Sequence, residues 1–406
     1  MARRQNIIAQ PAKEKLMLWV WWLYSGGIAL VLLGFLLDAF IGLPKLADLT
    51  RPEWDRRESN CLRVSVIVPA LNEENGIEGC LRSLAGQDYS NIEIIAVNDR
   101  SSDSTGAIMD RIAATSGGCL RVLHLSELPP GWLGKPHAMW SAAKLVTGDW
   151  LLFTDGDVVF QPGAIRRAVT YAETAHTDHL SLLPTLLTKS VGERMMISLF
   201  HFGLVAMRPW QSLAGPSRFA FGAGAFNMVR RSAYQQIGTF EALRMEVVED
   251  LALAQRVKRA GLISCVALAP GLVSLHWASG AMGIVRTLTK NGYAVIGFRW
   301  YIAALFTLLV LAFHVAPFVL MWIAPGWAKL GFALCVGCIF CFYLLFRRVT
   351  GINPAYFLLH PIGALLSVYA LLRSVVLTTL GGGVVWRGTK YSLHELRRAV
   401  ASRMAD

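Results

Sequence analysis

Two aspartates interrupt an apolar run in the stretch LLFTDGDVVF, which covers residues 151–160. Asp155 and Asp157 stand one residue apart, and the apolar residues on both sides have the pattern of a buried strand. At a separation of about 4 Å and an effective dielectric constant near 20, two carboxylates repel by roughly 4 kcal/mol. A buried pair therefore calls for a cation, whereas the alternative interpretation is a solvated Asp-Gly turn.

A second acidic pair, Glu249 and Asp250, opens the stretch VVEDLALAQRVKRAG (247–261). This stretch predicts a helix that begins at the two acids and ends at Gly261. A positioned carboxylate can take a proton from a hydroxyl group, so Asp250 is the candidate general base, with Glu249 as its immediate rival. The alternative is that both acids only complement the dipole of the helix.

Strands and helices alternate along residues 62–160. The apolar runs predict strands over residues 64–68, 92–97, 120–125 and 150–154, and helices that begin near residues 72–74, 103 and 135. This alternation predicts an α/β fold with a parallel, doubly wound sheet, whose ligands bind at the carboxyl ends of the strands. Residues 69–73, 98–103 and 155–157 lie at those ends, so Asp155 and Asp157 fall where chemistry is expected. Beyond residue 160 the alternation fades.

The chain is too apolar for an ordinary soluble protein, because 54% of its 406 residues are hydrophobic and its mean hydropathy is +0.45. Four apolar runs approach or exceed the length that crosses a hydrocarbon core about 30 Å thick, namely 16–43, 301–325, 330–346 and 355–380. The first is too long for a signal peptide and is interpreted as an anchor. The predicted organisation is a tail (1–15), a transmembrane anchor (16–43), a catalytic domain with interfacial helices (44–300), C-terminal transmembrane helices (301–380) and a cytosolic tail (381–406).

The net charge of +12 indicates contact with anionic lipid head groups or with an anionic substrate. No nucleic-acid motif accompanies it, so we expect no nucleic-acid partner. Basic residues favour the cytosolic side of a bacterial inner membrane, and we expect residues 44–300 to face the cytosol. However, Arg3 and Arg4 precede the first span, and four simple crossings cannot place every basic segment on one side. A re-entrant hairpin at 355–380, or a bend at Ser25–Gly27, would resolve the conflict.

Two further segments have the composition of helices that lie in the membrane interface. Residues 195–207 are apolar but too short to span a bilayer, and residues 279–301 mix apolar residues with Arg286, Lys290 and Arg299. We expect these segments to hold the active site at the bilayer surface, where a lipid head group can enter.

Four motifs jointly resemble the family-2 glycosyltransferases of GT-A fold, namely VSVIVPALNEE (64–74), VNDRSSDST (97–105), TDGD (154–157) and VVEDLALAQRVKRAG (247–261). The resemblance covers roughly residues 62–300. Two more motifs, GWLGKPHA (131–138) and WRGTKY (386–391), look like a membrane-bound subgroup that includes hopene-associated, carotenoid-acid and ceramide glucosyltransferase-like enzymes.

The resemblance implies a site for a nucleotide-diphosphate sugar and a divalent cation, Mg²⁺ or Mn²⁺. It makes Asp157 the metal ligand, with Asp155 beside it, and it puts the general base at Asp250, the second acid of its pair. Contacts to the nucleotide sugar are implied for Pro69, Glu73, Asp99, Lys135, Asp155, Arg299 and Trp300. Simpler roles remain open for several of these: Glu73 as a first-turn helix acid, Lys135 as a solvated loop lysine, Arg299 as a membrane-edge anchor and Trp300 as an aromatic-belt residue.

The expected function is inverting transfer of a single sugar, a hexose linked to uridine diphosphate, onto a membrane lipid. Polymerising relatives carry Gln-x-x-Arg-Trp, whereas IGFRW (296–300) has Ile296 in place of the glutamine. That difference disfavours the first alternative, a processive polysaccharide synthase. The second alternative is a catalytically silent membrane scaffold that retains the nucleotide-binding domain, and the complete set Asp99, Asp155, Asp157 and Asp250 disfavours it.

Overall fold

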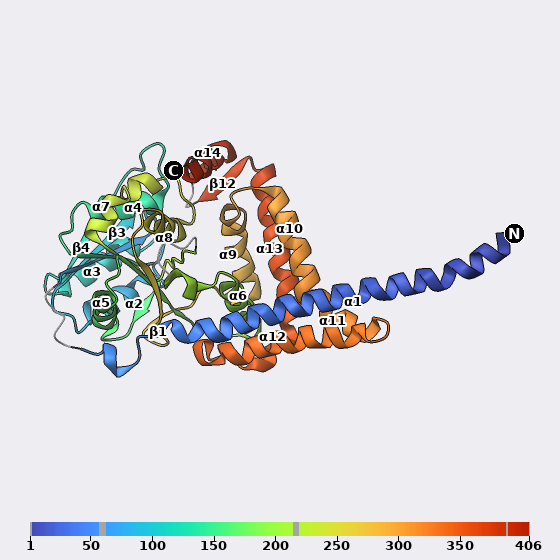
Figure 1. Cartoon of the computed structure of the whole chain (residues 1–406). Helices are drawn as coiled ribbons and strands as arrows, with labels where there is room; N and C mark the ends of the chain where they lie inside the picture. Colours follow the sequence, from blue (N-terminus) through green and yellow to red (C-terminus); the bar gives the residue numbers. More distant parts are fainter. Residues whose placement is uncertain (1, 57–61, 214–218, 387–388, 406) are drawn as a thin grey trace.

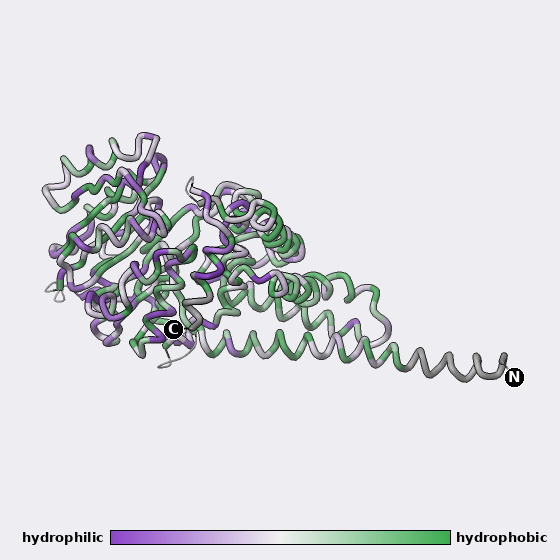
Figure 2. Tube along the Cα trace, turned by 90° about the horizontal axis from the view of Figure 1, so that it is seen from above, coloured by the Kyte–Doolittle hydropathy of each residue, from purple (hydrophilic) through white to green (hydrophobic). Residues whose placement is uncertain are grey.

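The computed structural model describes residues 2–56, 62–213, 219–386 and 389–405. An α/β domain lies at one end of the molecule, and long helices extend from it (Figure 1). Figure 2 shows that the coloured parts of these helices are mostly hydrophobic, whereas the α/β domain is mixed. The predicted fold class, an α/β domain with apolar helices before and after it in the chain, is confirmed.

Eight strands form the main sheet, in the order β1-β10-β7-β9-β5-β2-β3-β4. The four predicted strands lie within two residues of their expected bounds: β2 (Val64–Ala70), β3 (Ile92–Asp99), β4 (Leu120–Leu125) and β5 (Trp150–Phe153). The other four are β1 (Ala47–Asp48), β7 (His179–Leu183), β9 (Asn227–Arg230) and β10 (Ser264–Leu268). A smaller sheet joins β6 (Val159–Phe160), β11 (Val273–Leu275) and β8 (Thr185–Leu186).

The main sheet corrects the sequence-based prediction in two respects. It is not wholly parallel, because β9 pairs antiparallel with both β5 and β7. It also continues beyond residue 160, where the alternation could not be read. The reason is that β7, β9 and β10 are at most five residues long and are separated by long insertions.

Alternate residues of the central strands pack against different helices, as the two-residue period of a strand requires. Val66 and Val68 belong to a cluster with α2 (Ile77–Ala85), α3 (Thr105–Thr115) and α5 (Ala164–Thr174). Ile67 belongs to a second cluster with α4 (Gly134–Ala143), α7 (Arg231–Gln236) and α8 (Glu249–Arg259). The sheet is therefore covered on both faces, and its carboxyl edge stays available for a site.

The turn between β2 and α2 differs from the prediction. Helix α2 begins at Ile77 and not at residues 72–74, because Asn72 has a φ of +56°, which a right-handed helix does not allow. Glu73 thus lies in the turn and is not a first-turn helix acid. At the next turn, Asp103 accepts a hydrogen bond from Thr105 N at 3.0 Å, which satisfies a backbone donor where α3 begins.

Four helical segments are long and apolar enough to span a membrane: Leu16–Lys45, Trp300–Ile323, Ala328–Thr350 and Pro354–Leu380. Helix α1 (Ala2–Gly42) runs unbroken through Ser25–Gly27, so this segment does not interrupt it. Helix α13 (His360–Leu380) is also continuous and is not a re-entrant hairpin. Pro361 stands in the first turn of α13, where proline is tolerated, and this explains why it does not break the helix.

The apolar helices lie in two directions (Figure 1). Helix α1 packs along α12 (Ala328–Thr350), and α13 packs along α9 (Gly280–Val295). In Figure 1, α9, α10 (Trp300–Val310) and α13 run across the direction of α1 and α12. The chain turns between these directions at a π-helical turn, Leu311–Val315, which is followed by α11 (Ala316–Ile323) with Pro317 in its first turn.

Charged side chains join the helices to the α/β domain. Helix α6 (Val191–Ala206) is longer than the predicted segment 195–207. Glu193 lies in its first turn, and its carboxylate accepts hydrogen bonds from Lys189 N and Gly280 N at 2.5 and 2.7 Å. This ties the start of α6 to the start of α9. Asp38 of α1 pairs with Arg208, which follows α6, at 2.6 Å. The domain and its apolar helices are therefore held by ion pairs and hydrogen bonds as well as by apolar packing.

Candidate active site

Both acidic pairs meet at Lys135. Its Nζ lies 2.6 Å from Asp155 Oδ1 and 2.5 Å from Glu249 Oε1, and only 13% of its side chain is exposed. Lys135 comes from the first turn of α4, Asp155 from the turn after β5, and Glu249 from the first residue of α8. Burial alone would lower the pKa of Lys135, but the Asp155 and Glu249 carboxylates raise it, so the ammonium stays charged. Lys135 is thus not a solvated loop lysine.

Asp157 lies on the other side of the turn that follows β5, close to the carboxylates of Asp155 and Glu73. Burial raises the pKa of Asp157 to about 7, and the nearby carboxylates of Asp155 and Glu73 add to the effect. The start of α2 approaches closely, because a Cβ at Gly76 would lie 3.0 Å from Asp157 Cα. The turn is therefore not a freely solvated Asp-Gly turn, and a cation there would relieve the repulsion among three carboxylates.

Asp250 lies beside Glu249 but has different contacts. Its Oδ1 accepts a hydrogen bond from Leu251 N at 2.7 Å, and its carbonyl oxygen accepts one from Asn227 Nδ2 at 3.2 Å. Burial raises the pKa of Asp250, the Glu249 charge raises it further, and Lys135 opposes both. Lys135, Glu249 and Asp250 together line a small cavity. A carboxyl group with a raised pKa is suited to take up a proton near neutral pH.

Two glycines of the loop before β9 bring the acidic pairs together. A Cβ at Gly224 would lie 2.5 Å from Asp155 Oδ2, and a Cβ at Gly222 would lie 2.1 Å from the carbonyl oxygen of Asp250. Asp155 N also donates to Gly224 O at 3.1 Å. The predicted site residues did not include this loop. The alternate glycines of FGAGAF (221–226) are the sequence signal for this close backbone approach.

Asp99 lies at the carboxyl end of β3 and is fully buried. Its Oδ1 accepts a hydrogen bond from Arg100 Nε at 2.8 Å. A Cβ at Gly134 would lie 2.7 Å from Asp99 Oδ2 and 2.8 Å from Arg100 Nη2, so the start of α4 fits closely over this pair. Arg100 Nη2 and His137 Nδ1 are buried without a hydrogen-bond partner among the described residues. Buried polar groups are rarely left unpaired, so these two atoms are candidates for contact with a ligand.

The remaining predicted residues lie outside the acidic cluster. Pro69 is buried within β2, in register with Val97 of β3. Arg299 and Trp300 stand at the start of α10, where Trp300 is 66% exposed and packs edge-on against Tyr301. The structure therefore joins Glu73, Asp155, Asp157, Lys135, Glu249 and Asp250, but it does not bring Arg299 or Trp300 into that group.

The C-terminal tail returns to the site through a hairpin, β12 (Gly383–Trp386) and β13 (Thr389–Ser392). Tyr391 donates a hydrogen bond to Trp132 O at 3.1 Å, three residues before Lys135. Helix α14 (Leu393–Ala405) follows, and its Val400 packs in one cluster with Leu133 and Val247. Of the WRGTKY motif, Arg387 and the side chain of Trp386 lie outside the described residues.

Residues 65–238 match the family described as "Glycosyl transferase family 2". The chain carries a family-2 glycosyltransferase domain. The 4,4'-diaponeurosporenoate glycosyltransferase of Staphylococcus haemolyticus (strain JCSC1435) is 23% identical over 233 residues, which cover 56% of this chain and 60% of that protein. The uncharacterized glycosyltransferase EpsJ of Bacillus subtilis (strain 168) is 35% identical over 115 residues, or 28% of this chain and 32% of that protein. The chain thus spans less than two thirds of the length of either relative.

The mannosyltransferase PcManGT from Pyrobaculum calidifontis, solved in complex with GDP-Man and Mn²⁺, shares the fold. The TM-score is 0.51 at 19% sequence identity, and the match covers 88% of this chain and 99% of that one. The resemblance read from the motifs is therefore confirmed at the level of the family-2 domain and of the GT-A-like fold.

The residues of the acidic cluster fit a divalent cation that shares its ligands with a substrate. Asp155 and Asp157 offer hard carboxylate oxygens. Burial and, after it, the neighbouring carboxylates raise the pKa of Asp157, and a cation would offset both effects. No group of three or more His, Cys, Asp or Glu side chains forms a complete metal site among the described residues. Mg²⁺ in particular commonly takes one or two carboxylates and completes its shell with phosphate oxygens and water.

The glycine loop yields a direct prediction. Gly224→Ala puts a Cβ 2.5 Å from Asp155 Oδ2 and 3.4 Å from Lys135 Nζ, so Asp155 must move. A displacement of about 1 Å near reacting groups can cost on the order of 10²-fold in rate. We expect sugar transfer, measured with a labelled nucleotide sugar, to fall at least ~10-fold.

Gly203→Ala on α6 is the matched control, because a Cβ there meets nothing within 4 Å. It should keep the activity of the unmodified protein. Equal activity of the Gly224→Ala and Gly203→Ala proteins would contradict the role assigned to the loop.

Proposed function

We propose that this protein is an inverting glycosyltransferase. It moves a single hexose from a donor, a hexose linked to uridine diphosphate, onto a membrane lipid. The observation that carries the proposal is Lys135, which joins the Asp155–Asp157 turn to the Glu249–Asp250 pair at the carboxyl edge of the sheet. In a doubly wound sheet this edge is where ligands bind. The apolar helices that precede and follow the domain in the chain would keep it at a membrane.

The donor end of the proposed site consists of Asp155, Asp157, Lys135, Glu73 and the buried Asp99. A Mg²⁺ or Mn²⁺ ion held by Asp157 and Asp155 would neutralise charge that develops on the leaving diphosphate. The ammonium group of Lys135 is already buried in the cluster and contacts Asp155. When the donor binds, this group would exchange a carboxylate contact for a contact with the diphosphate oxygens. Mn²⁺ and GDP-Man in the mannosyltransferase of the same fold support this assignment. Pro69 would shape the floor of the donor site, and Arg299 and Trp300 would border it from the membrane side.

Asp250 is the proposed general base. Glu249 Oε1 lies 2.5 Å from Lys135 Nζ, so the Glu249 carboxylate is already engaged in an ion pair. Asp250 would take the proton from an acceptor hydroxyl while the oxygen attacks the anomeric carbon. The bond from that carbon to the diphosphate oxygen breaks, and the diphosphate leaves with the electron pair. One displacement of this kind inverts the configuration.

The proposed acceptor is a lipid. Helices α6 and α9 connect the domain to the apolar helices, and α9 contains Arg286 and Lys290 among apolar residues, as expected for an interfacial helix. The relative from S. haemolyticus is named for glycosylation of 4,4'-diaponeurosporenoate. That name supports an acceptor of lipid character, although it belongs to the relative.

The proposed location is the inner membrane of a bacterium, with several crossings and with residues 44–300 and 381–406 in the cytosol, where nucleotide sugars are made. The domain-side ends of α1 and α12 support this orientation, because Lys45, Arg347 and Arg348 lie there. The same reasoning assigns residues 1–15 to a tail, 16–43 to an anchor and 301–380 to membrane helices.

The experiment that tests this function uses membranes containing the full chain. Incubation with labelled uridine-, guanosine- and other nucleotide-linked sugars, together with a bacterial lipid extract, should yield one labelled lipid that carries a single sugar. Faster labelling of a water-soluble acceptor would overturn the lipid assignment, and a labelled polymer would support a processive synthase. Donor binding without any transfer would support the silent scaffold.

Removal of the divalent cation should abolish transfer. A chelator in excess should stop it, and added Mn²⁺ or Mg²⁺ should restore it, because Asp155 and Asp157 supply only hard oxygen ligands. Asp157→Asn, which keeps the shape of the side chain, should remove activity at every metal concentration. Asp110→Asn is the control, because Asp110 is an exposed carboxylate that pairs with His124 on α3 and β4. Full activity in excess chelator would rule out the metal role.

Asp250→Asn should keep donor binding and lose transfer by on the order of 10²–10⁴-fold, the usual contribution of a general base. The base must be deprotonated to act, so kcat/KM of the unmodified protein should fall as the pH drops below the raised pKa of Asp250. This acidic limb of the pH profile should disappear from the residual activity of Asp250→Asn. Glu249→Gln should retain the limb, and an inactive Glu249→Gln beside an active Asp250→Asn would reverse the assignment.

A further inference from the structure

Three polar side chains are buried in a row across the main sheet. Ser264 begins β10, His179 begins β7 and Asn227 begins β9, and their exposed fractions are 0%, 0% and 2%. Ser264 and His179 are partners in the parallel register of β10 and β7. Asn227 pairs with Ser181, two residues after His179, so His179 and Asn227 are diagonal neighbours on one face of the sheet. Buried polar groups are costly unless each one is hydrogen-bonded, so this row requires specific partners.

Hydrogen bonds join the three side chains to the start of α8. Asn227 Nδ2 donates to the carbonyl oxygen of Asp250 at 3.2 Å, and Asn227 Oδ1 contacts His179 Nε2. His179 Nδ1 in turn lies 2.8 Å from Ser264 Oγ. The chain of contacts therefore runs from β10 through β7 and β9 to the backbone of Asp250.

Each hydrogen in this chain has one possible place. A carbonyl oxygen only accepts, so Asn227 must turn its NH2 group to Asp250 and its oxygen to His179. His179 Nε2 must then carry the hydrogen, and Nδ1 accepts from the Ser264 hydroxyl. Burial lowers the pKa of His179 to about 4, so the ring is neutral near pH 7. The direction of the hydrogen bonds is therefore fixed near neutral pH.

The end of this chain lies at the candidate active site. Asn227 lines the same small cavity as Lys135, Glu249 and Asp250. The glycine loop also approaches the Asp250 carbonyl, because a Cβ at Gly222 would lie 2.1 Å from its oxygen. The first turn of α8 is therefore fixed to the sheet by a hydrogen bond as well as by packing, and the position of the Asp250 carboxylate depends on both.

We propose that Asn227 and His179 are positioning residues for the general base. Asn227 holds the backbone of Asp250, and His179 holds the Asn227 amide in the orientation that can donate. This inference rests on the proposed function, because it takes Asp250 as the group that accepts the proton. A base that is displaced by about 1 Å can lose on the order of 10²-fold in rate.

The first test compares two substitutions of His179 in the full chain. His179→Gln keeps an N–H group near the place of Nε2, so it should retain most of kcat. His179→Leu removes that donor and lets the Asn227 amide turn, so it should lower kcat at least ~10-fold. KM for the nucleotide sugar should stay the same in both variants, because the loss falls on the transfer step. Equal kcat values for His179→Gln and His179→Leu would overturn the proposal.

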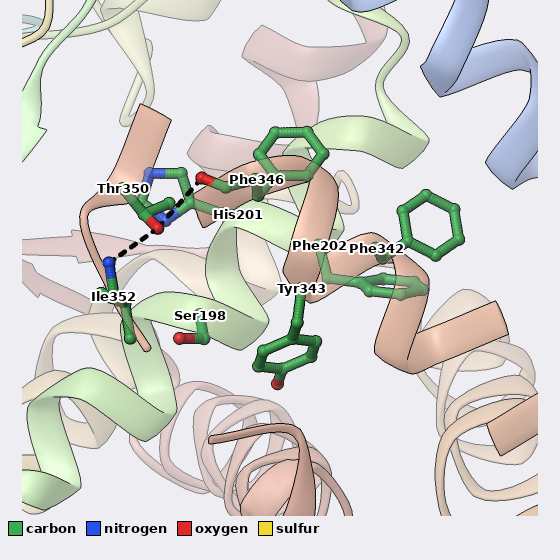
Figure 3. A pocket seen from close by; sticks show the side chains of 8 residues that line it. All are labelled: Ser198, His201, Phe202, Phe342, Tyr343, Phe346, Thr350 and Ile352. Atoms are coloured by element: carbon green, nitrogen blue, oxygen red, sulfur yellow. Dashed lines mark hydrogen bonds between the residues drawn. The ribbon is translucent and has the colours of Figure 1, made fainter. Parts of the chain in front are cut away.

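His201→Leu is the matched control, because it removes another buried histidine. His201 lies on α6 in a small cavity whose lining includes Phe202 and Tyr343 (Figure 3). Its Nδ1 donates to Ile197 O of the same helix at 2.8 Å, so this hydrogen bond does not lead to the site. The variant should keep the kcat of the unmodified protein. Equal losses in His179→Leu and His201→Leu would mean that any buried histidine has this effect, and would overturn the proposal.

The second test separates positioning from a general effect on the fold. Asn227→Leu should lower kcat of the unmodified protein at least ~10-fold, but it should not lower the residual activity of Asp250→Asn any further. The reason is that the position of residue 250 no longer matters once the base is gone. Equal losses in both backgrounds would overturn the proposal. Binding of UDP with Mn²⁺, measured by calorimetry, checks that each variant is folded, and if Asn227→Leu does not fold, the His179 variants decide.

The outcomes distinguish this inference from the proposed function. If the unmodified protein transfers sugar while His179→Leu and Asn227→Leu keep its kcat, the positioning role is overturned and the proposed function stands. If the unmodified protein transfers no sugar, the proposed function fails, and the positioning role fails with it.

Discussion

The ion pairs of Lys135 hold the site together. Asp155, Asp157, Glu249 and Asp250 bring four carboxyl groups to one edge of the sheet, and Lys135 is within 2.6 Å of two of them. When one partner of a buried ion pair is removed, the uncompensated charge typically costs about 3–5 kcal/mol. The arrangement thus needs a positive charge at all times, from the lysine or from a bound cation. A site that must keep this balance is suited to exchange charged ligands.

The backbone makes this balance possible. Gly222 and Gly224 allow the loop before β9 to touch Asp250 and Asp155 from one side, and Gly134 allows α4 to cover Asp99 from the other. Strand β9 anchors the loop, because it pairs antiparallel between β5 and β7. The single antiparallel strand of the main sheet is therefore what lets a loop return to the edge where parallel strands end.

The sequence alone predicted the elements whose signals are local. Strands β2 to β5 are rich in apolar residues, and Asp155 and Asp157 stand just after β5, so their place at the sheet edge could be read. Strand β9 could not be read, because its four residues pair with β5 and β7, which lie far away in the sequence. Lys135 was a candidate, yet its two carboxylate partners lie 20 and 114 positions away in the sequence. These ion pairs depend on the order of the strands in the sheet, which cannot be read from the spacing of residues in the sequence.

The crosswise direction of α9, α10 and α13 has a consequence for the bilayer (Figure 1). If α1 and α12 cross the hydrocarbon core, the crosswise helices lie along one face of it, next to the α/β domain. The molecule then displaces more lipid from the leaflet beneath the domain than from the opposite leaflet. A protein that occupies more area in one leaflet fits best where the membrane curves so that this leaflet is expanded. The local curvature of the membrane would therefore influence where the protein accumulates.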